Sequence, residues 1–169
     1  ICSNRRARSD QEIAKKLGIT KPLYNLPHGF DYNLYYPIPQ NIARLYYEYN
    51  DDDFMILNLN RNQPRKRWDI SIIAWAKFLI LCYNKYNKID NLKLVIGTSM
   101  TGYWDLMEIF QNEIVFSEIP WEDAKKTIIK VDNPQQLSDR DINILYNACD
   151  LGLNTADGEG FGLCTFEGL

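Results

Sequence analysis

The sequence lacks the marks of several protein classes. Its four cysteines are far apart and form no Cys-x-x-Cys pair, so neither a disulfide framework nor a zinc site is expected. Reduced thiols of this kind are typical of a cytoplasmic protein. The longest apolar stretch, from Ile70 to Tyr83, contains Lys77 and is too short to span about 30 Å of hydrocarbon. It therefore predicts a buried helix and no transmembrane segment.

A strong charge of either sign is also missing. The net charge of -3 provides no general positive field for nucleic acid, so binding of an anion must depend on a few placed cations. The first ten residues carry arginines with no apolar segment behind them, so they are not expected to be a signal peptide. The chain has no initiator Met and ends at Glu167-Gly168-Leu169, and we expect it to be part of a longer protein.

What is present is the composition of an ordinary globular domain, with 46% hydrophobic and 24% charged residues. A chain of 169 residues can bury roughly 70% of its unfolded surface, so one domain is expected. We assign residues 1–22 to a linker with a short helix at 10–17. Ser9-Asp10-Gln11-Glu12 has the capping-box pattern, and Gly18 can end that helix. Residues 23–169 are assigned to the domain.

This domain alternates strand-like and helical segments. Continuous apolar runs such as Phe54-Met55-Ile56-Leu57 are typical of strands that are covered on both faces. Strands are expected at residues 54–57, 92–97, 114–116, 127–131 and 151–153. Helices are expected at residues 41–49, 68–84, 103–110 and 138–149, with another beginning near residue 163. Repeated β-then-α units of this size predict the α/β class, with a Rossmann-like, doubly wound parallel sheet.

A basic loop follows the first of the central strands. Arg61, Arg65, Lys66 and Arg67 all lie in it, between a strand and a helix. In a parallel sheet, ligands bind at the carboxyl ends of the strands, where helix N-termini favour anions. The loop is therefore a candidate phosphate site. A solvated basic turn is the alternative when the basic run is taken alone.

A glycine-bearing loop follows the last expected strand, at residues 159–167. Its small residues allow the backbone to approach a ligand closely, and the helix expected after it offers free N–H groups. Glu159 and Glu167 bracket the loop and can accept hydrogen bonds from hydroxyl groups in one pocket. An ordinary β-to-α turn with a surface glutamate is the alternative.

Taken together, the two loops resemble those of glycosyltransferase family 4, whose fold is similar to that of glycogen synthase. The family pattern is an Arg after the first strand of the nucleotide domain, a Lys five positions later, and a late Glu-x7-Glu that contains Glu-Gly-Phe-Gly. Arg61, Lys66, Glu159 and Glu167 match it. The turn His28-Gly29-Phe30-Asp31 also resembles the family's Asn-Gly-Val-Asp segment, with His28 in place of the Asn. The resemblance runs from about Leu23 to the end of the chain.

This resemblance implies the C-terminal, nucleotide-sugar-binding half of a GT-B fold, and it implies a role for each matched residue. Arg61 and Lys66 would neutralise the diphosphate as the sugar–phosphate bond breaks. Glu159 would contact the donor sugar, and Glu167 would hold the ribose hydroxyls. The remaining donor-binding positions that the resemblance implies are His28, Gly29, Gly160, Phe161, Gly162 and Leu163. Of these, Phe161, Gly162 and Leu163 would offer their backbone N–H groups to the sugar and phosphates.

The reaction implied is transfer of a sugar from a nucleoside-diphosphate sugar to an acceptor hydroxyl, with retention of anomeric configuration and without a bound metal or other cofactor. The acceptor, whether glycan, lipid or protein, is not readable from the residues. The N-terminal acceptor-binding domain of the family has no counterpart in these residues, so the fragment alone is expected to be inactive. The expected location is the cytoplasm, with a peripheral position at a membrane face allowed.

Other motifs point to competing sites more weakly. Asp51-Asp52-Asp53 is similar to the metal-binding Asp-x-Asp of the other glycosyltransferase fold, but here the acids precede a strand, which favours a solvated turn. Gly158-Glu159-Gly160 lacks the third glycine of a dinucleotide fingerprint, and residues 97–102 lack the Lys-Ser/Thr of a P-loop. Neither a metal nor a nucleotide cofactor of these kinds is expected.

Two alternative functions stay open from the residues alone. A nucleotide-sugar-binding or scaffold module could keep this fold without turnover, and a nucleotide-sugar epimerase of related architecture could use the same site. A single-strand nucleic-acid binder, with the N-terminal arginines beside tyrosines such as Tyr35 and Tyr36, is disfavoured because packing explains the aromatic residues more simply. His28, the only histidine, is by itself more often a structural hydrogen-bonding residue.

Overall fold

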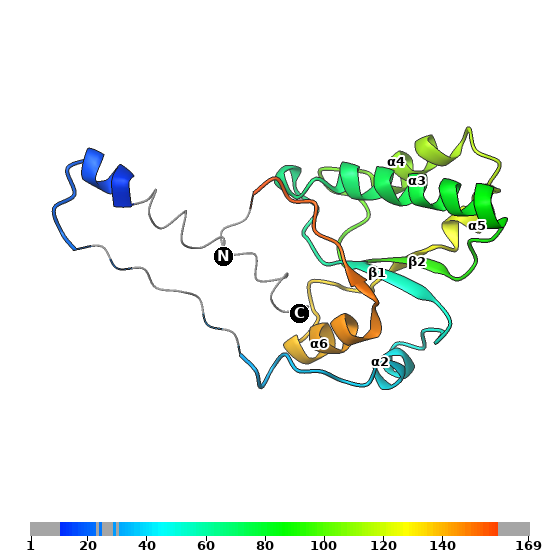
Figure 1. The fold of residues 1–169 in the computed structure, drawn as a ribbon, viewed down its shortest axis with the longest axis horizontal. Helices are drawn as coiled ribbons and strands as arrows, with labels where there is room; N and C mark the ends of the chain where they lie inside the picture. The colour runs from blue at the N-terminus through cyan, green and yellow to red at the C-terminus, as the bar shows by residue number, and fades with distance from the viewer. Residues whose placement is uncertain (1–10, 23, 25–28, 30, 159–169) are drawn as a thin grey trace.

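The strands predicted at residues 54–57 and 92–97 form the centre of a parallel sheet (Figure 1). The computed structural model describes residues 11–22, 24, 29 and 31–158. Among these residues the sheet has four strands in the order β3-β2-β1-β4. Their bounds are β1 Phe54–Asn58, β2 Leu92–Ile96, β3 Ile128–Lys130 and β4 Leu151–Gly152. Every pairing is parallel, which confirms the predicted α/β, Rossmann-like class.

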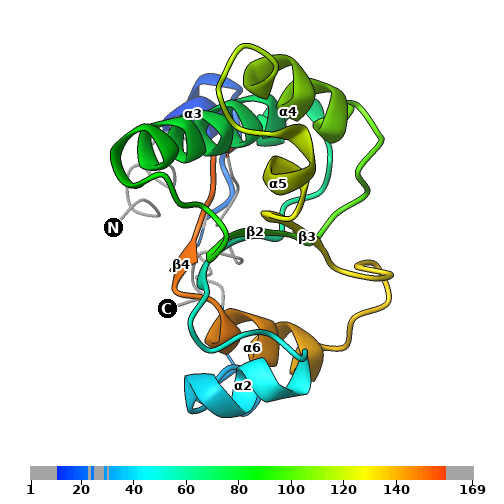
Figure 2. The same cartoon turned by 90° about the vertical axis from the view of Figure 1, so that its right-hand side faces the viewer.

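Helices cover both faces of this sheet, as Figure 2 shows. On one face lie α3 (Trp68–Tyr86), α4 (Leu106–Ile114) and α5 (Trp121–Lys125), and on the other lie α2 (Gln40–Tyr46) and α6 (Asp139–Ala148). Side chains of β2 alternate between the two layers: Leu94 and Ile96 pack into the core under α3, while Val95 packs into the core with Leu145 of α6. Because both faces of the sheet are covered, the strands do not show a regular alternation of apolar and polar residues.

One predicted strand, Ile114-Val115-Phe116, is wrong. Ile114 is the last residue of α4, and its side chain is buried on the same helix face as Leu106 and Phe110, four residues apart each time. Val115 and Phe116 are exposed instead, Phe116 to 96%. The helix begins at Leu106 rather than at residue 103, because the Asp105 carboxylate caps it by accepting the N–H of Glu108 at 3.0 Å.

Most of the other predicted elements are confirmed with shifted ends. Residues 11–16 are helical and Gly18 follows with a φ of 76°, as expected for a left-handed helix end. Ser138 begins α6 with the capping box in place, its hydroxyl accepting from Asp141 N–H. The short helix α5 was not predicted, and the helix expected from residue 163 lies outside the described residues. Among the residues described, no helix has the length and apolarity needed to cross a membrane.

The burial of Phe110 in α4 and the exposure of Phe116 after it lead to a stability prediction. Phe110→Ala should lower the free energy of unfolding by about 3–5 kcal/mol, because the ring is fully buried between α3 and α5 and its removal leaves a cavity. Phe116→Ala removes the same atoms from an exposed site and should change the free energy by less than about 0.5 kcal/mol. Urea unfolding of both variants gives the measurement. Similar losses of stability in the two variants would contradict this placement of Phe110 and Phe116.

Candidate functional site

The candidate site lies where β1 and β4 end. These strands are neighbours in parallel register, with Ile56 opposite Leu151 and Leu57 opposite Gly152, so their carboxyl ends reach the same edge of the sheet. The N–H of Leu153 continues the pairing by donating to Leu57 O at 2.7 Å. Figure 1 shows the segment after β4 running to the start of α3, which is where the basic loop ends. The basic loop and the segment that leads toward Glu159 therefore leave from adjacent strands.

Hydrogen bonds hold the segment after β4 against the basic loop. Asp157 N–H donates to Arg65 O at 2.9 Å, and Arg65 Nη1 donates to Gly158 O at 3.1 Å. The Thr155 hydroxyl lies 3.1 Å from Lys66 O and 3.0 Å from Arg67 O, to which it can donate. The chain that leads into Glu159 is thus fixed beside Lys66 as far as Gly158.

Lys66 is buried, which is unusual for a lysine. Its side chain belongs to the short 3-10 helix η1 (Pro64–Lys66), and its Nζ donates to Asn60 Oδ1 at 2.8 Å. Only 7% of the residue is exposed. A buried ammonium is costly unless hydrogen-bonded partners surround it, so the polar side chains near Lys66 are part of what makes its position possible.

Arg61 has a different setting, at the exposed end of the same loop. Within the described part of the chain its guanidinium makes no hydrogen bond or ion pair. It can therefore present its fork of donors to an anion without breaking an internal contact. Arg61 and Lys66 lie on the same loop, which follows β1 at the carboxyl edge of the sheet.

Arg67 uses its charge within the protein. It takes a left-handed backbone conformation (φ 49°, ψ 51°) immediately before α3. Its guanidinium donates to both carboxylate oxygens of Asp69, at 3.0 and 2.8 Å, and lies 3.4 Å from the Asp157 carboxylate. The hydrogen bond from Arg67 lowers the pKa of Asp69 below its ordinary value of 3.8. Arg67 thus ties the segment after β4 to α3 and is not a free phosphate ligand.

The loop after β2 joins the same edge through Asn62. Asn62 N–H donates to Thr98 Oγ1 at 3.0 Å, while its side chain accepts from Trp104 N–H at 3.0 Å and donates to Trp104 O at 2.8 Å. Gly102 packs so closely that an added Cβ would lie 3.0 Å from Asn62 Cγ. Asn62 was not predicted from the sequence. The only sequence feature that points to it is its position directly after Arg61, a candidate phosphate ligand.

The other predicted residues are placed in part. Gly29 is exposed, with no atom within 4 Å of a Cβ added there, and no contact joins it to the basic loop among the described residues. The turn at Asp51-Asp52-Asp53 precedes β1, at the sheet edge opposite Arg61, and Asp51 and Asp52 are exposed. The remaining candidates lie outside the described residues: His28, Glu159, Gly160, Phe161, Gly162, Leu163 and Glu167.

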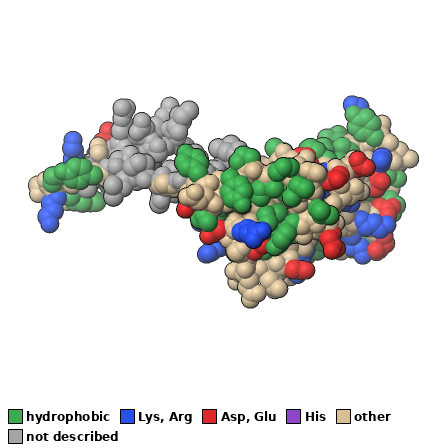
Figure 3. All heavy atoms as spheres, turned by 90° about the horizontal axis from the view of Figure 1, so that it is seen from below, with side chains coloured by type: hydrophobic (Ala, Val, Ile, Leu, Met, Phe, Trp, Pro, Cys, Tyr) green, Lys and Arg blue, Asp and Glu red, His purple; other side chains and the backbone are tan. Residues whose placement is uncertain are grey.

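A separate hollow of about 520 Å³ lies on the far layer, between α2 and α6. It is lined mainly by apolar side chains, including Tyr36, Ile42 and Ile144. The charged side chain of Arg140 also lines it. Figure 3, which views the molecule from below, shows hydrophobic side chains gathered over these helices. None of the predicted site residues that the structure describes, Gly29, Arg61 and Lys66, lines this hollow.

The parallel sheet with helices on both faces defines a Rossmann-like α/β domain, and solved structures share this arrangement of the backbone. The chain is similar to the C-terminal domain of the glycosyl transferase group 1 family protein LpcC from Francisella tularensis, with a TM-score of 0.58 and 20% identity over 83% of this chain and 65% of that one. It is also similar to sucrose-phosphate synthase from Thermosynechococcus elongatus, with a TM-score of 0.58 and 19% identity over 94% of this chain and 36% of that one. No family model and no curated protein matches the chain.

These likenesses confirm the predicted fold, which has the backbone arrangement of the C-terminal half of a GT-B fold. The chain spans about two thirds of the LpcC domain and about a third of the synthase. At these identities the comparison establishes how the backbone is arranged, and the assignment of donor, reaction and residues remains a proposal.

The Arg67–Asp69 pair leads to a pH-dependent prediction. A carboxylate whose pKa is lowered by folding adds stability that is present above the ordinary value of 3.8 and is lost as pH falls through the lower, folded pKa. Asp69→Asn should therefore lower the free energy of unfolding by about 1 kcal/mol at pH 7, since the pair is bidentate but partly exposed.

The difference between wild type and Asp69→Asn should shrink below pH 3.8. Denaturant unfolding at pH 7 and at pH 3 measures it. Asp90→Asn breaks an exposed pair in which Lys88 Nζ lies 3.7 Å from Asp90, and it serves as the control with little effect at either pH. An Asp69→Asn effect that is the same at both pH values would count against this assignment.

Proposed function

We propose that the chain is the donor-binding half of a retaining, metal-independent glycosyltransferase of the hexosyltransferase type. It would bind a nucleoside-diphosphate sugar, whose sugar is transferred to an acceptor hydroxyl. The observation that carries this proposal is the packing of the basic loop, with Arg61 and Lys66, against the segment that leads from β4 into Glu159. The GT-B fold of the neighbours supports it.

In this proposal Arg61 and Lys66 are electrostatic catalysts. Negative charge grows on the diphosphate as the bond to the sugar breaks, so cations fixed beside it stabilise the transition state more than the bound substrate. Lys66 supplies a charge in a largely water-excluded position, where its interaction with a phosphate oxygen is stronger than in bulk water. Arg61 supplies an exposed, planar donor pair that suits two phosphate oxygens.

The glycine-bearing loop completes the proposed donor site. Glu159 would accept hydrogen bonds from sugar hydroxyls, and Glu167 from the ribose. Backbone N–H groups at the start of the following helix would face the phosphates, where the helix dipole favours an anion. The residues proposed for backbone and close contacts are Gly160, Phe161, Gly162 and Leu163, with His28 and Gly29 from the turn before the domain.

The whole reaction requires more than this chain in our proposal. An N-terminal domain would bind the acceptor, whether glycan, lipid or protein, and would supply further active-site groups. Residues 23–169 would then be the donor domain and residues 1–22 the connection to the preceding region. We place the protein in the cytoplasm, with a peripheral position at a membrane face allowed.

Binding of nucleoside diphosphates tests the proposal directly. Calorimetry with UDP, GDP and ADP should detect binding of at least one of them. Arg61→Ala and Lys66→Ala should each weaken it about 10- to 100-fold, because charge-assisted hydrogen bonds contribute about 1.5–3 kcal/mol.

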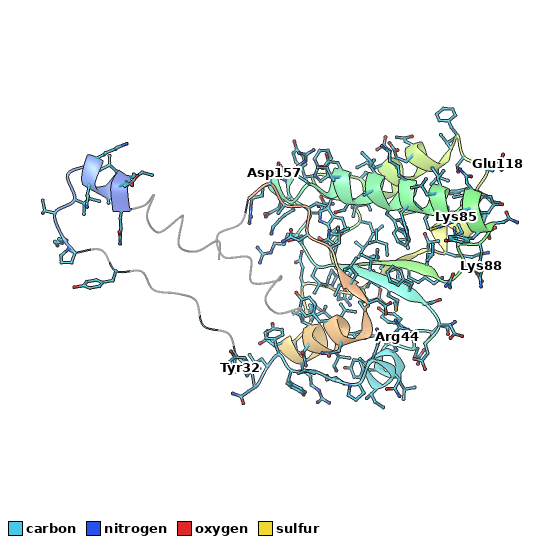
Figure 4. All side chains as sticks on the ribbon, viewed as in Figure 1. Tyr32, Arg44, Lys85, Lys88, Glu118 and Asp157 are labelled. Carbon is cyan, nitrogen blue, oxygen red and sulfur yellow. The ribbon has the colours of Figure 1, made fainter. Side chains whose placement is uncertain are left out.

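Lys85→Ala is the matched control, since Lys85 is an exposed cation near the other end of α3, far from Asp157 in Figure 4. It should leave the affinity unchanged. Negligible heat with all three nucleotides on a folded sample, or equal losses for Lys85→Ala and Lys66→Ala, would contradict the proposal. Incubation of the full-length protein with labelled nucleotide sugars then separates transfer from epimerisation and from binding without turnover.

A further inference from the structure

The Lys66 ammonium is oriented by a buried amide, that of Asn60. Asn60 is 3% exposed and directly precedes Arg61 in the basic loop. Its Oδ1 accepts from Lys66 Nζ at 2.8 Å. An ammonium has donors and no acceptor, so Asn60 must turn its oxygen toward Lys66 and its Nδ2 group away.

The Nδ2 group of Asn60 is also engaged, which leaves the side chain one orientation. It donates to Asn58 Oδ1 at 2.9 Å and lies 3.2 Å from Asn154 Oδ1 in the segment after β4. The backbone of Asn60 is fixed as well, since its N–H donates to Asn58 Oδ1 at 3.0 Å and its carbonyl accepts from Trp68 Nε1 at 3.1 Å. Three residues besides Lys66 therefore hold Asn60 in place: Asn58, Asn154 and Trp68.

A chain of hydrogen bonds leads from Asn58 back to the basic loop. Because Asn58 Oδ1 accepts from Asn60, its Nδ2 is the group that donates to Ser71 Oγ, at 3.0 Å. Ser71 Oγ lies 2.7 Å from Thr155 Oγ1. Because the single hydroxyl proton of Thr155 is shared between the carbonyls of Lys66 and Arg67, Ser71 is left as the donor to Thr155. The network thus fixes both the backbone and the ammonium of Lys66.

We propose that Asn60 is a positioning residue for the diphosphate, because its Oδ1 holds the Lys66 ammonium at the carboxyl end of β1. A lysine has four rotatable side-chain bonds, and its charge acts on a phosphate only where that charge is held. Through Asn154 the same amide couples this position to the segment that leads into the glycine-bearing loop. The inference rests on the proposed diphosphate-binding role of Lys66.

The test compares a nucleoside diphosphate with its monophosphate, for the base that wild type binds best. The ratio of the two affinities measures the contribution of the terminal phosphate to binding. Asn60→Ala should weaken diphosphate binding about tenfold and leave monophosphate binding within about twofold, because only the terminal phosphate needs the oriented ammonium. Lys66→Ala should lower the same ratio at least as much.

Asn143→Ala is the matched control. Asn143 is an equally buried asparagine in α6 whose Oδ1 accepts from Tyr36 N–H, in the layer on the other side of the sheet. It should reduce stability without changing the ratio. Asn60→Asp is the second variant should Asn60→Ala fail to fold: its carboxylate keeps an acceptor for Lys66 but competes with phosphate for the ammonium, so the ratio should again fall.

The outcomes separate the two claims. A ratio that falls with Lys66→Ala but stays at the wild-type value with folded Asn60→Ala or Asn60→Asp overturns the positioning role. An equal loss for diphosphate and monophosphate shows a structural role of Asn60 and overturns it as well. If Lys66→Ala leaves the ratio unchanged, the proposed function of Lys66 fails, and this inference fails with it.

Discussion

The structure of the candidate site depends on one contact, the packing of the Thr155 hydroxyl against the backbone carbonyls of Lys66 and Arg67. Parallel pairing of β1 with β4 brings the basic loop and the segment at residues 153–158 to the same edge of the sheet, but it does not set the distance between them. The hydroxyl does so, together with the bonds between Arg65 and residues 157 and 158. The protein's own hydrogen bonds therefore hold the segment after β4, as far as Gly158, against the basic loop.

Burial of a cation has a cost that explains the composition of this edge. A buried ammonium must be hydrogen-bonded, and the buried groups that serve it must in turn be satisfied. This requirement accounts for Asn58, Asn60 and Ser71, three polar residues that are almost fully buried between β1 and α3. The charge of Arg67, in contrast, is compensated by two carboxylates, so Arg67 has a structural role. Lys66 and Arg67, neighbours in one loop, are thus stabilised in different ways.

The sequence predicted the elements whose pattern is local. The strands at residues 54–58 and 92–96 were recognisable because a doubly covered strand is continuously apolar, and Ser138 was recognisable as a helix cap. The run at 114–116 misled because three apolar residues are compatible with a strand or with a helix end. Among the candidate site residues, Arg61 and Lys66 were predicted from the basic loop after a strand and from the resemblance to glycosyltransferase family 4. Asn60, Asn62 and Thr155 were not, because their partners are set by tertiary packing, up to 94 residues away.

A crystal structure of the chain with a bound nucleoside-diphosphate sugar tests the central claim most directly, that the basic loop and the glycine-bearing loop converge on one diphosphate. The account predicts phosphate oxygens within hydrogen-bonding distance of Lys66 Nζ and the Arg61 guanidinium, with the carboxylates of Glu159 and Glu167 on the sugar and the ribose. A nucleotide bound in the apolar hollow between α2 and α6, or carboxylates on the opposite edge of the sheet from Lys66, would contradict it.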